Sequence, residues 1–263
     1  MLKYVHLEQT DSTNAFLQRK QSETDIRNWV VSADEQTAGK GMGSNTWESE
    51  AGKNLTFSFA LDMGFLPAER QFLLSVAVPL GIVEVLDTML PAEKLNIKWP
   101  NDIYYEDRKI AGILIENAII GSELKYAVAG IGLNVNQTVF VSNAPNPFSL
   151  RLIDGKERDI ETLSRLLMTE IETTEQQSPE EVWRYYKAHL YRREGFWRFI
   201  EREVSSAPTM NYSPSTEKRD GERSERPIFL AKIEDVRTDG ELELRDQDGN
   251  LRTYHFKQVR YVI

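Results

Sequence analysis

Apolar and polar positions alternate along the first part of the chain in a way that predicts strands and helices in turn. A helical segment with a polar cap begins after Ser12, and a longer helix is framed by Pro67 and Pro91. Period-two alternation predicts strands, and a period near 3.6 predicts the longer helix. The predicted strands lie at 2–8, 29–35 and 54–61, and the long helix at about 69–89.

After Pro91 the pattern changes to short strands separated by turn residues. These strands are predicted at 95–99, 102–106, 108–120 and 125–136. Strands that follow one another favour a mixed or antiparallel sheet over a doubly wound one. A helical stretch at about 160–190 closes this larger domain. The predicted fold class is therefore α+β, with a mixed or antiparallel sheet and helices over residues 1–190.

The C-terminal part predicts a second, smaller domain over residues 191–263. Strands are expected at 196–200, 227–236, 240–246 and 251–263, with hairpin-type turns between the last three. This pattern is typical of a small all-β barrel. Residues 204–226 hold serine, proline, asparagine and balanced charges with few aliphatic side chains, so we expect a mobile insertion there.

Composition narrows the classes of function. With 263 residues, 40% hydrophobic content and no cysteine, the chain can bury a full core, and zinc-finger or cysteine-nucleophile chemistry is excluded. The 41 acidic and 32 basic residues give a net charge of -9, which argues against general nucleic-acid binding. The N-terminal residues lack a basic segment followed by an apolar block. We therefore expect a soluble, cytoplasmic protein that contacts no membrane.

One loop combines glycines, a cation and an indole. Gly39, Gly41 and Gly43 stand at alternate positions, with Lys40 among them and Trp47 close behind. Such a loop can wrap an anion, because glycines let successive N–H groups point inward and the indole offers a face to a base. A flexible surface turn with a buried tryptophan explains the pattern equally well. The loop fits neither the dinucleotide fingerprint nor the GxxxxGK[ST] phosphate loop.

Charged residues crowd the next predicted turn and the strand after it. Lys98, Asn101 and Asp102 lie in one tight turn, which a type I turn with solvated charges would explain in isolation. Lys98 and Asp102 also supply a cation for phosphate oxygens and a carboxylate for magnesium. Lys109 precedes Gly112, where a small residue permits close approach of an anion. A simple strand-end lysine is the alternative.

The sequence also contains a strand with two glycines, a helix cap and three histidines. A later strand contains Gly130 and Gly132, and glycine inside a strand marks a bulge or a ligand. Asn134 follows them, and an asparagine amide matches the donor and acceptor edge of adenine. Ser12 or Asp11 is expected to cap the first helix with its side chain. The three histidines lie in unrelated segments, which disfavours a hydrolase triad.

Taken together and in order, these motifs resemble those of the biotin protein ligases, also called biotin-[acetyl-CoA-carboxylase] ligases. The resemblance covers about Leu7 to Asn136 and rests on DSTN, QTAGKGMGSNTW, KWPND, KIAGILIE and GIGLNVN. KWPND followed closely by KIAGIL is highly specific. The C-terminal segment resembles the SH3-like domain of that family. The resemblance implies a class II synthetase-like catalytic domain followed by a small SH3-like β-barrel.

The resemblance also implies a reaction and a set of site residues. Enzymes of this family join biotin to ATP as biotinyl-5′-AMP, with Mg2+ accompanying the ATP, and then pass biotin to one lysine of a biotin carboxyl carrier domain. The implied biotin-binding residues are Ser12, Thr13, Asn14, Gln36, Gly39, Lys40, Gly41, Met42, Lys109 and Gly112. The implied nucleotide-binding residues are Trp47, Lys98, Asn101, Asp102 and Asn134. The implied catalytic residues are Lys109, Lys40 and Lys98, with Asp102 as metal ligand.

The chain departs from the family pattern in its glycine-rich loop. That loop usually reads Gly-Arg-Gly-Arg or Gly-Arg-Gly-Gln, whereas Lys40 and Met42 stand at the corresponding positions here. The chain also opens directly on the first catalytic strand, without the helix-turn-helix domain of some relatives. We therefore expect no nucleic-acid binding. The sequence allows a homodimer but does not determine the oligomeric state.

The main alternative is a lipoate or octanoate protein ligase or transferase of the same fold. Its pocket is expected to be an apolar tunnel, whereas the polar set Ser12, Thr13 and Gln36 favours the ureido ring of biotin. A nucleotide-responsive binding module without catalysis and a synthetase-like adenylase are weaker alternatives, the latter because the chain has no basic RNA-binding extension.

Overall fold

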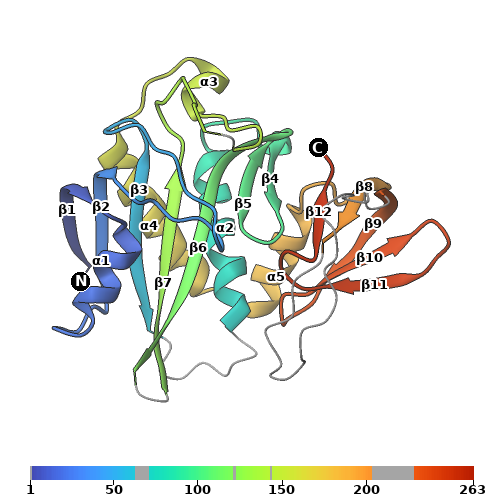
Figure 1. The fold of residues 1–263 in the computed structure, drawn as a ribbon, viewed down its shortest axis with the longest axis horizontal. Helices are drawn as coiled ribbons and strands as arrows, with labels where there is room; N and C mark the ends of the chain where they lie inside the picture. Colours follow the sequence, from blue (N-terminus) through green and yellow to red (C-terminus); the bar gives the residue numbers. More distant parts are fainter. Residues whose placement is uncertain (1, 63–70, 121–122, 143, 203–227) are drawn as a thin grey trace, which may run out of the picture. The chain divides into compact units, whose positions relative to one another are not determined.

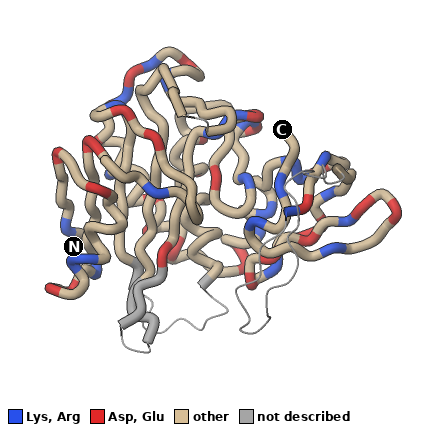
Figure 2. The backbone as a smooth tube through the Cα atoms, viewed as in Figure 1, with Lys and Arg blue, Asp and Glu red and all other residues tan. Residues whose placement is uncertain are grey.

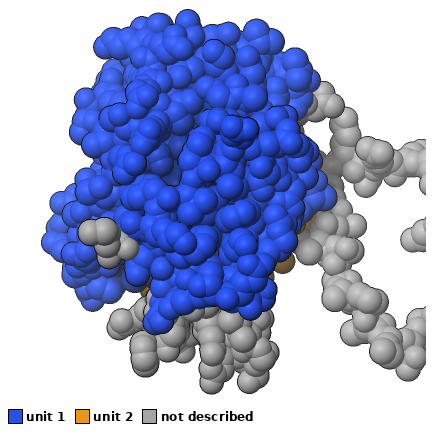
Figure 3. Space-filling model, turned by 90° about the vertical axis from the view of Figure 1, so that its left-hand side faces the viewer, with its two compact units in different colours: residues 1–191 blue, residues 192–263 orange. Residues whose placement is uncertain are grey.

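The computed structural model describes residues 2–62, 71–120, 123–142, 144–202 and 228–263. The chain forms two compact units, residues 1–191 and 192–263 (Figure 3). The predicted insertion at 204–226 and the start of the predicted helix at 69–70 lie outside the described residues. In the described part of the chain, no helix has both the length and the apolar character needed to cross a membrane.

Unit 1 alternates strands and helices along the chain (Figure 1). Its strands are β1 (Lys3–Thr10), β2 (Trp29–Gln36), β3 (Leu55–Asp62), β4 (Leu95–Lys98), β5 (Asp102–Tyr105), β6 (Arg108–Ile120) and β7 (Glu123–Leu133). Its helices are α1 (Thr13–Lys20), α2 (Gln71–Asp87), the 3-10 turn η2 (Ala92–Lys94), α3 (Leu150–Asp154), α4 (Ile160–Glu175) and α5 (Pro179–Ala188).

The strands of unit 1 form a seven-stranded mixed sheet in the order β1-β2-β3-β7-β6-β5-β4. β1 and β2 pair in parallel, and every other neighbouring pair is antiparallel. The long β6–β7 hairpin lies near the centre of the order. The predicted α+β class with a mixed sheet is therefore confirmed.

Helices pack on the sheet through apolar stripes. In Figure 1, α2 and α4 lie behind the strands. Leu163, Leu167 and Ile171 recur along α4 at helical spacing and are buried. A Cβ built on Gly81 of α2 would lie 3.0 Å from the Ile171 Cα, so the glycine permits the two helices to approach closely. Ser178 caps α5 by accepting from the Glu181 N–H.

The two faces of β3 and β7 differ in chemistry because side chains alternate along a strand. Phe57 and Phe59 of β3, and Ile131 of β7, are buried apolar residues of the core. Ser58 and Gly130 point to the opposite face, where they meet the start of α1. That opposite face of the sheet carries the candidate site.

Unit 2 is a five-stranded antiparallel sheet in the order β11-β10-β9-β8-β12. Its strands are β8 (Trp197–Glu201), β9 (Ile228–Val236), β10 (Leu242–Asp246), β11 (Leu251–Tyr254) and β12 (Val259–Tyr261). Phe199 is fully buried and packs against Phe229 and Tyr261, with ring centroids 6.0 Å and 4.9 Å away. This antiparallel sheet is consistent with the predicted SH3-like barrel.

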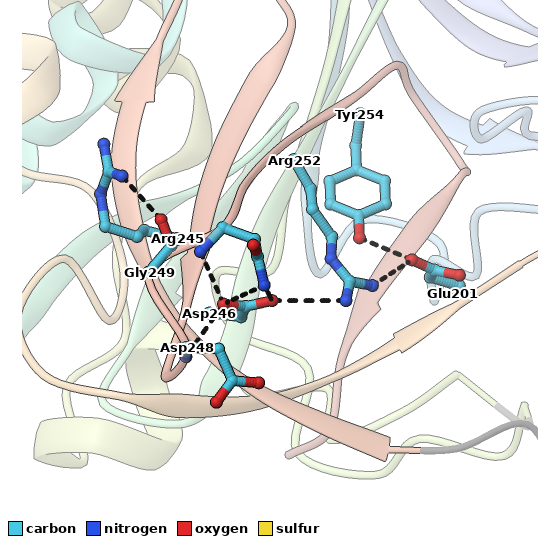
Figure 4. A network of polar contacts seen from close by, with 8 residues as sticks. Glu201, Arg245, Asp246, Asp248, Gly249, Arg252 and Tyr254 are labelled. Atoms are coloured by element: carbon cyan, nitrogen blue, oxygen red, sulfur yellow. Dashed lines mark hydrogen bonds and ion pairs between the residues drawn. The ribbon is translucent and has the colours of Figure 1, made fainter.

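A polar network shows how strongly this sheet curls (Figure 4). Glu201 of β8 accepts from the Tyr254 hydroxyl at 2.7 Å and from Arg252 Nη1 at 3.1 Å, both on β11. The sheet order separates β8 and β11 by two strands, so these contacts require the sheet to bend round. Arg252 also contacts Asp246 at 3.3 Å. Burial, and then Glu201, raise the pKa of Tyr254 to about 12.

The prediction of a single strand over 251–263 is wrong. The structure divides it into β11 and β12, because residues 255–258 form a turn. The Gln258 N–H donates to the His255 carbonyl, and the Gln258 side chain accepts from the His255 N–H at 2.7 Å. Lys257 adopts a positive φ of 70°. No glycine or proline marks this turn in the sequence.

Candidate functional site

Two glycines of β7 form the floor of the candidate site. A Cβ built on Gly130 would lie 2.2 Å from Asn14 Oδ1, and one on Gly132 would lie 2.3 Å from Trp47 Cε2. Both separations are far below a van der Waals contact, so only glycine lets Asn14 and Trp47 approach the strand. Because Gly130 and Gly132 are two residues apart, they share one face and bring two groups of side chains next to each other.

The first group, called the polar cluster, consists of Thr13, Asn14, Gln36, Ser58 and Glu116. Gln36 Oε1 accepts from the Thr13 N–H at 2.8 Å and from Thr13 Oγ1 at 3.1 Å. Ser58 Oγ lies 2.6 Å from both Thr13 Oγ1 and Asn14 Oδ1. Asn14 Nδ2 donates to Glu116 at 2.8 Å. The cluster is continuous from β2 through the start of α1 to β3 and β6.

These contacts fix the direction of two amide groups. Thr13 uses the oxygen of Gln36 twice, so Gln36 can offer its NH2 group as a donor. That nitrogen lies 3.4 Å from a Cβ built on Gly39, at the start of the glycine-rich loop. Asn14 presents its NH2 group to Glu116 and the Leu114 carbonyl. Thr13, Asn14 and Ser58 are at most 3% exposed, so the cluster is preorganised.

The glycine-rich loop folds back on itself as a narrow hairpin. The Trp47 N–H donates to the Gly39 carbonyl at 2.9 Å, and the Gly41 N–H donates to the Asn45 carbonyl at 2.8 Å. Gly43 takes a positive φ of 71° at the tip. A Cβ built on Gly39 would lie 2.7 Å from the Trp47 carbonyl oxygen. The hairpin thereby delivers the Trp47 ring to the glycine floor.

The second group, called the charged cluster, consists of Trp47, Asp102 and Lys109. Lys109 Nζ lies 2.6 Å from Asp102 Oδ1 and 5.6 Å from the centroid of the Trp47 ring. The Lys109 and Asp102 side chains are 24% and 18% exposed, so the ion pair is partly shielded from water. Gly112 faces both Trp47 and Lys109. Figure 2 shows few charges on the neighbouring strands β3 and β7. Beside the floor, the Lys109–Asp102 ion pair lies in the charged cluster and the Glu116 carboxylate in the polar cluster.

Three further predicted residues surround the charged cluster. Lys98 lies opposite Asp102 in the backbone register of the β4–β5 hairpin, and its Nζ donates to the Tyr104 hydroxyl at 3.1 Å. Asn101 Nδ2 donates to the carbonyl of Ile113, which ties the turn to β6. Asn134 directly follows the last residue of β7, and its Nδ2 donates to the Phe148 carbonyl at 3.0 Å.

Two buried polar atoms near the floor have no hydrogen-bond partner among the described residues. They are Trp47 Nε1 and Asn134 Oδ1. A buried polar group without a partner is costly, so such atoms mark a place where a ligand or water completes the site. Both belong to residues for which the motifs imply contact with the nucleotide.

Some predicted residues lie apart from these contacts. Lys40 is exposed, and its backbone bridges to Thr46 within the hairpin. Met42 lies near the hairpin tip and is half-buried. Of the two residues expected to cap α1, Ser12 is the N-cap residue but its side chain makes no cap hydrogen bond, so that prediction is wrong. Asp11, the other candidate, accepts from the Ser12 N–H at 2.8 Å. Gln36 takes that role from another strand by accepting from the Thr13 N–H.

The sequence analysis gave no role to two members of the polar cluster, although Glu116 ends the KIAGILIE motif. Ser58 lies in the apolar run of β3, and Glu116 ends the apolar run of β6. A polar residue that interrupts such a run was the available signal, because it predicts a strand face that does not belong to the core. Their partners, however, lie 44 and 102 residues away from them in sequence.

Comparisons with known proteins show which proteins this chain resembles. Residues 6–134 match the family described as Biotin/lipoate A/B protein ligase family. The biotin--[acetyl-CoA-carboxylase] ligase of Mycobacterium tuberculosis is 35% identical over 132 residues, which are 49% of this chain and 48% of that protein. The resemblance to biotin protein ligases is thereby confirmed.

Two other matches extend the comparison. The bifunctional ligase/repressor BirA of Escherichia coli is 33% identical over 162 residues, 61% of this chain and 50% of that protein. The chain thus spans about half the length of these curated relatives. A solved structure of the biotin protein ligase from Aquifex aeolicus, in complex with biotin and ATP, has a TM-score of 0.71 at 20% identity and covers 100% of both chains. That likeness supports the fold.

Proposed function

We propose that the chain is an ATP-dependent biotin protein ligase. The observation that carries the proposal is the placement of the polar cluster beside the charged cluster, over one glycine floor, in the region that matches the ligase family. One cluster suits a small neutral ring with donors and acceptors, and the other suits an anion. Biotin combines both features, since a ureido ring and a carboxylate stand at its opposite ends.

In the proposed first step, an oxygen of the biotin carboxylate attacks the α-phosphorus of ATP. The bond between that phosphorus and the pyrophosphate oxygen breaks, which gives biotinyl-5′-AMP and pyrophosphate. Both reactants are anions, so cations must offset their repulsion. Lys109 would hold the carboxylate, and Gly112 would let it lie close to β6. Lys40 and Lys98 would add positive charge toward the phosphates.

In the proposed second step, a lysine amine of a biotin carboxyl carrier domain attacks the acyl carbon of the adenylate. An amide bond forms, the bond between the acyl carbon and the phosphate oxygen breaks, and AMP leaves with the proton balance completed by solvent. No side chain of the ligase becomes acylated in this scheme. Holding the two reactants in place is therefore the main task of the site.

The polar cluster would bind the ring end of biotin. Gln36 can donate its NH2 group to the ureido oxygen, since Thr13 occupies its carbonyl oxygen. Ser12, Thr13 and Asn14 would complete the polar wall, and the backbone of the loop from Gly39 to Met42 would cover the adenylate. Buried hydrogen-bonding groups discriminate strongly against a ligand that lacks their partners.

The nucleotide would lie against Trp47 and Asn134. The Trp47 ring offers a stacking face, and Asn134 Oδ1 can accept from an amino group such as that of adenine. Asn101 would help to position the phosphates.

Among the described residues, Asp102 is the carboxylate that would hold Mg2+ at this place. The described residues contain no group of three metal-ligating side chains, which fits a magnesium ion that arrives with the nucleotide rather than a resident metal. Asp102 would hold such an ion together with phosphate oxygens, and the ion would neutralise phosphate charge. Lys109 pairs with Asp102 at 2.6 Å, so the carboxylate would then be shared.

Exchange of labelled pyrophosphate into ATP tests the proposal. The full-length chain should catalyse exchange when biotin is present and should not when biotin is omitted. Lipoate and octanoate are tested in place of biotin, because a lipoate or octanoate ligase of the same fold would catalyse exchange with one of these acids instead. Exchange that depends on lipoate, or ATP binding without any exchange, would contradict the proposal. Transfer to a purified carrier domain then tests the second step.

A further inference from the structure

Glu48 directly follows Trp47, and its carboxylate collects three hydrogen bonds from one segment of the chain. The Val141 N–H donates to it at 2.8 Å, the Ser142 N–H at 2.9 Å and Gln137 Nε2 at 3.3 Å. Burial raises the pKa of Glu48, but hydrogen bonding from the side chain and backbone of Ser142, from the Val141 N–H and from Gln137 outweighs burial and leaves the pKa below its ordinary value. The carboxylate is therefore held in its charged form by the segment that it contacts.

Residues 137–142 and 144–149, called the strap, are also anchored at their first residue. Gln137 is 2% exposed, and its Oε1 accepts from the Glu50 N–H at 3.0 Å and from Asn54 Nδ2. The start of the strap is thus fixed to the chain that follows Trp47. Val139 and Val141 are 66% and 85% exposed, so apolar packing does not hold this part of the strap. The hydrogen bonds from the Val141 and Ser142 N–H groups to Glu48 hold it instead.

The other end of the strap lies against the charged cluster. The Lys109 N–H donates to the Asn146 carbonyl at 3.0 Å, and the Phe148 N–H donates to the Lys109 carbonyl at 2.8 Å. The Phe148 carbonyl accepts from Asn134 Nδ2 at 3.0 Å. The strap therefore runs from the residue next to Trp47 to the backbone of Lys109 and the amide of Asn134.

We infer that Glu48 is a positioning residue for the nucleotide half of the site, and this inference rests on the proposed function. Glu48 fixes the strap to the end of the glycine-rich hairpin, and the strap orients Lys109 and Asn134. Its three partners are all donors, so a carboxylate satisfies them fully. A glutamine of the same shape would turn one NH2 group toward a donor and leave it unsatisfied. The polar cluster has no part in these contacts, and the strap reaches the biotin half of the site only through the backbone of Lys109, so biotin binding should be affected less than ATP binding.

The test compares Glu48→Gln with Glu50→Gln in the full-length chain. Glu50 is a neighbouring exposed glutamate whose backbone N–H, not its side chain, contacts the strap. For Glu48→Gln, the KM for ATP in biotin-dependent pyrophosphate exchange should rise by about tenfold, the size expected for losing one charge-assisted hydrogen bond. The KM for biotin should rise less than the KM for ATP, because the strap contacts only the backbone of Lys109 in the biotin half of the site. Glu50→Gln should leave both constants unchanged.

Two additional measurements keep the inference separate from the proposed function. Amide hydrogen exchange at Val141 and Ser142 should quicken in Glu48→Gln and stay slow in Glu50→Gln, whether or not the chain is an enzyme. Glu48→Asp, which keeps the charge, should restore part of the affinity for ATP. Wild-type protein without biotin-dependent exchange would refute the proposed function. Active wild type, with equal rises in both constants or with no rise for Glu48→Gln, would overturn the inference.

Discussion

Replacing Gly132 with alanine places a methyl group in space that the Trp47 ring already fills. The new Cβ would lie 2.3 Å from Cε2 and 2.6 Å from Cζ2 and Nε1 of that ring. A normal contact is about 3.5–4.0 Å, so the ring must move away by more than about 1 Å. Gly132 lies on the central strand β7, which is paired on both sides and has little freedom to yield.

The magnitude follows from the cost of overpacking. Forcing an extra methyl into a packed site costs about 1–3 kcal/mol, or about 5-fold to 150-fold in an equilibrium constant. A Cβ on Gly112 would approach the same ring only to 3.0 Å, at Cζ3. Gly112→Ala should therefore destabilise the chain less than Gly132→Ala.

Urea unfolding of four variants measures this cost as a double-mutant cycle. The set is wild type, Gly132→Ala, Trp47→Ala and the double variant. Gly132→Ala should lower the free energy of unfolding in the wild-type background and have little effect once the Trp47 ring is absent. In pyrophosphate exchange, Gly132→Ala should also raise the KM for ATP, because Trp47 no longer lies where the nucleotide would stack.

Equal costs of Gly132→Ala with and without the Trp47 ring would refute this reasoning. Such a result would mean that the ring does not lie on Gly132 in solution. The cost of Gly132→Ala could depend on the Trp47 ring as expected while the KM for ATP stays unchanged. That result would support the packing of Trp47 on Gly132 but contradict its contact with the nucleotide.

Three other changes test separate parts of the account. Lys109→Ala should abolish biotin-dependent pyrophosphate exchange with an unchanged circular dichroism spectrum; activity in this variant would count against the assignment. Lys94→Ala, at a half-buried lysine that pairs with Glu106 away from the site, should keep wild-type exchange. Met42→Arg should slow escape of biotinyl-AMP in a single turnover, because a guanidinium forks to phosphate oxygens; unchanged release would discard this role. Folded Tyr254 keeps its proton up to about 12, against an ordinary pKa of 10.0, so the wild type should lose stability across that interval relative to Tyr254→Phe. Parallel unfolding curves for the two proteins against pH would contradict the raised pKa of Tyr254, which burial and then the Glu201 contact cause.

The periodicity of apolar residues predicted most of the strands and helices of the fold. Period-two alternation located β1, β2 and β3, and the run of short strands indicated the mixed sheet, because burial on one face imposes those periods directly on the sequence. The turn at His255–Gln258 escaped, since Gln258 closes it with its own side chain and no glycine or proline signals it. Turns closed by ordinary side chains leave no compositional mark.

The sequence predicted a site residue only where that residue stands in a recognisable motif, and it did not show which motifs come together. Trp47 and Lys109 stand in separate motifs, and the structure brings them together on the glycine floor. Ser58 and Glu116 were missed because their roles depend on contacts made between strands that are distant in sequence. The hydrogen bonds from the Val141 and Ser142 N–H groups to Glu48 could not be predicted either, since backbone N–H groups are present in every segment.

The central claim is that a biotin carboxylate oxygen becomes bonded to the α-phosphorus of ATP within the site of unit 1. Biotin with isotopically heavy carboxylate oxygens, supplied with ATP and a carrier domain, tests it most directly. The account predicts that mass spectrometry finds one heavy oxygen in the AMP released and the other in the new amide. AMP without the heavy isotope, or heavy oxygen in orthophosphate, would contradict it.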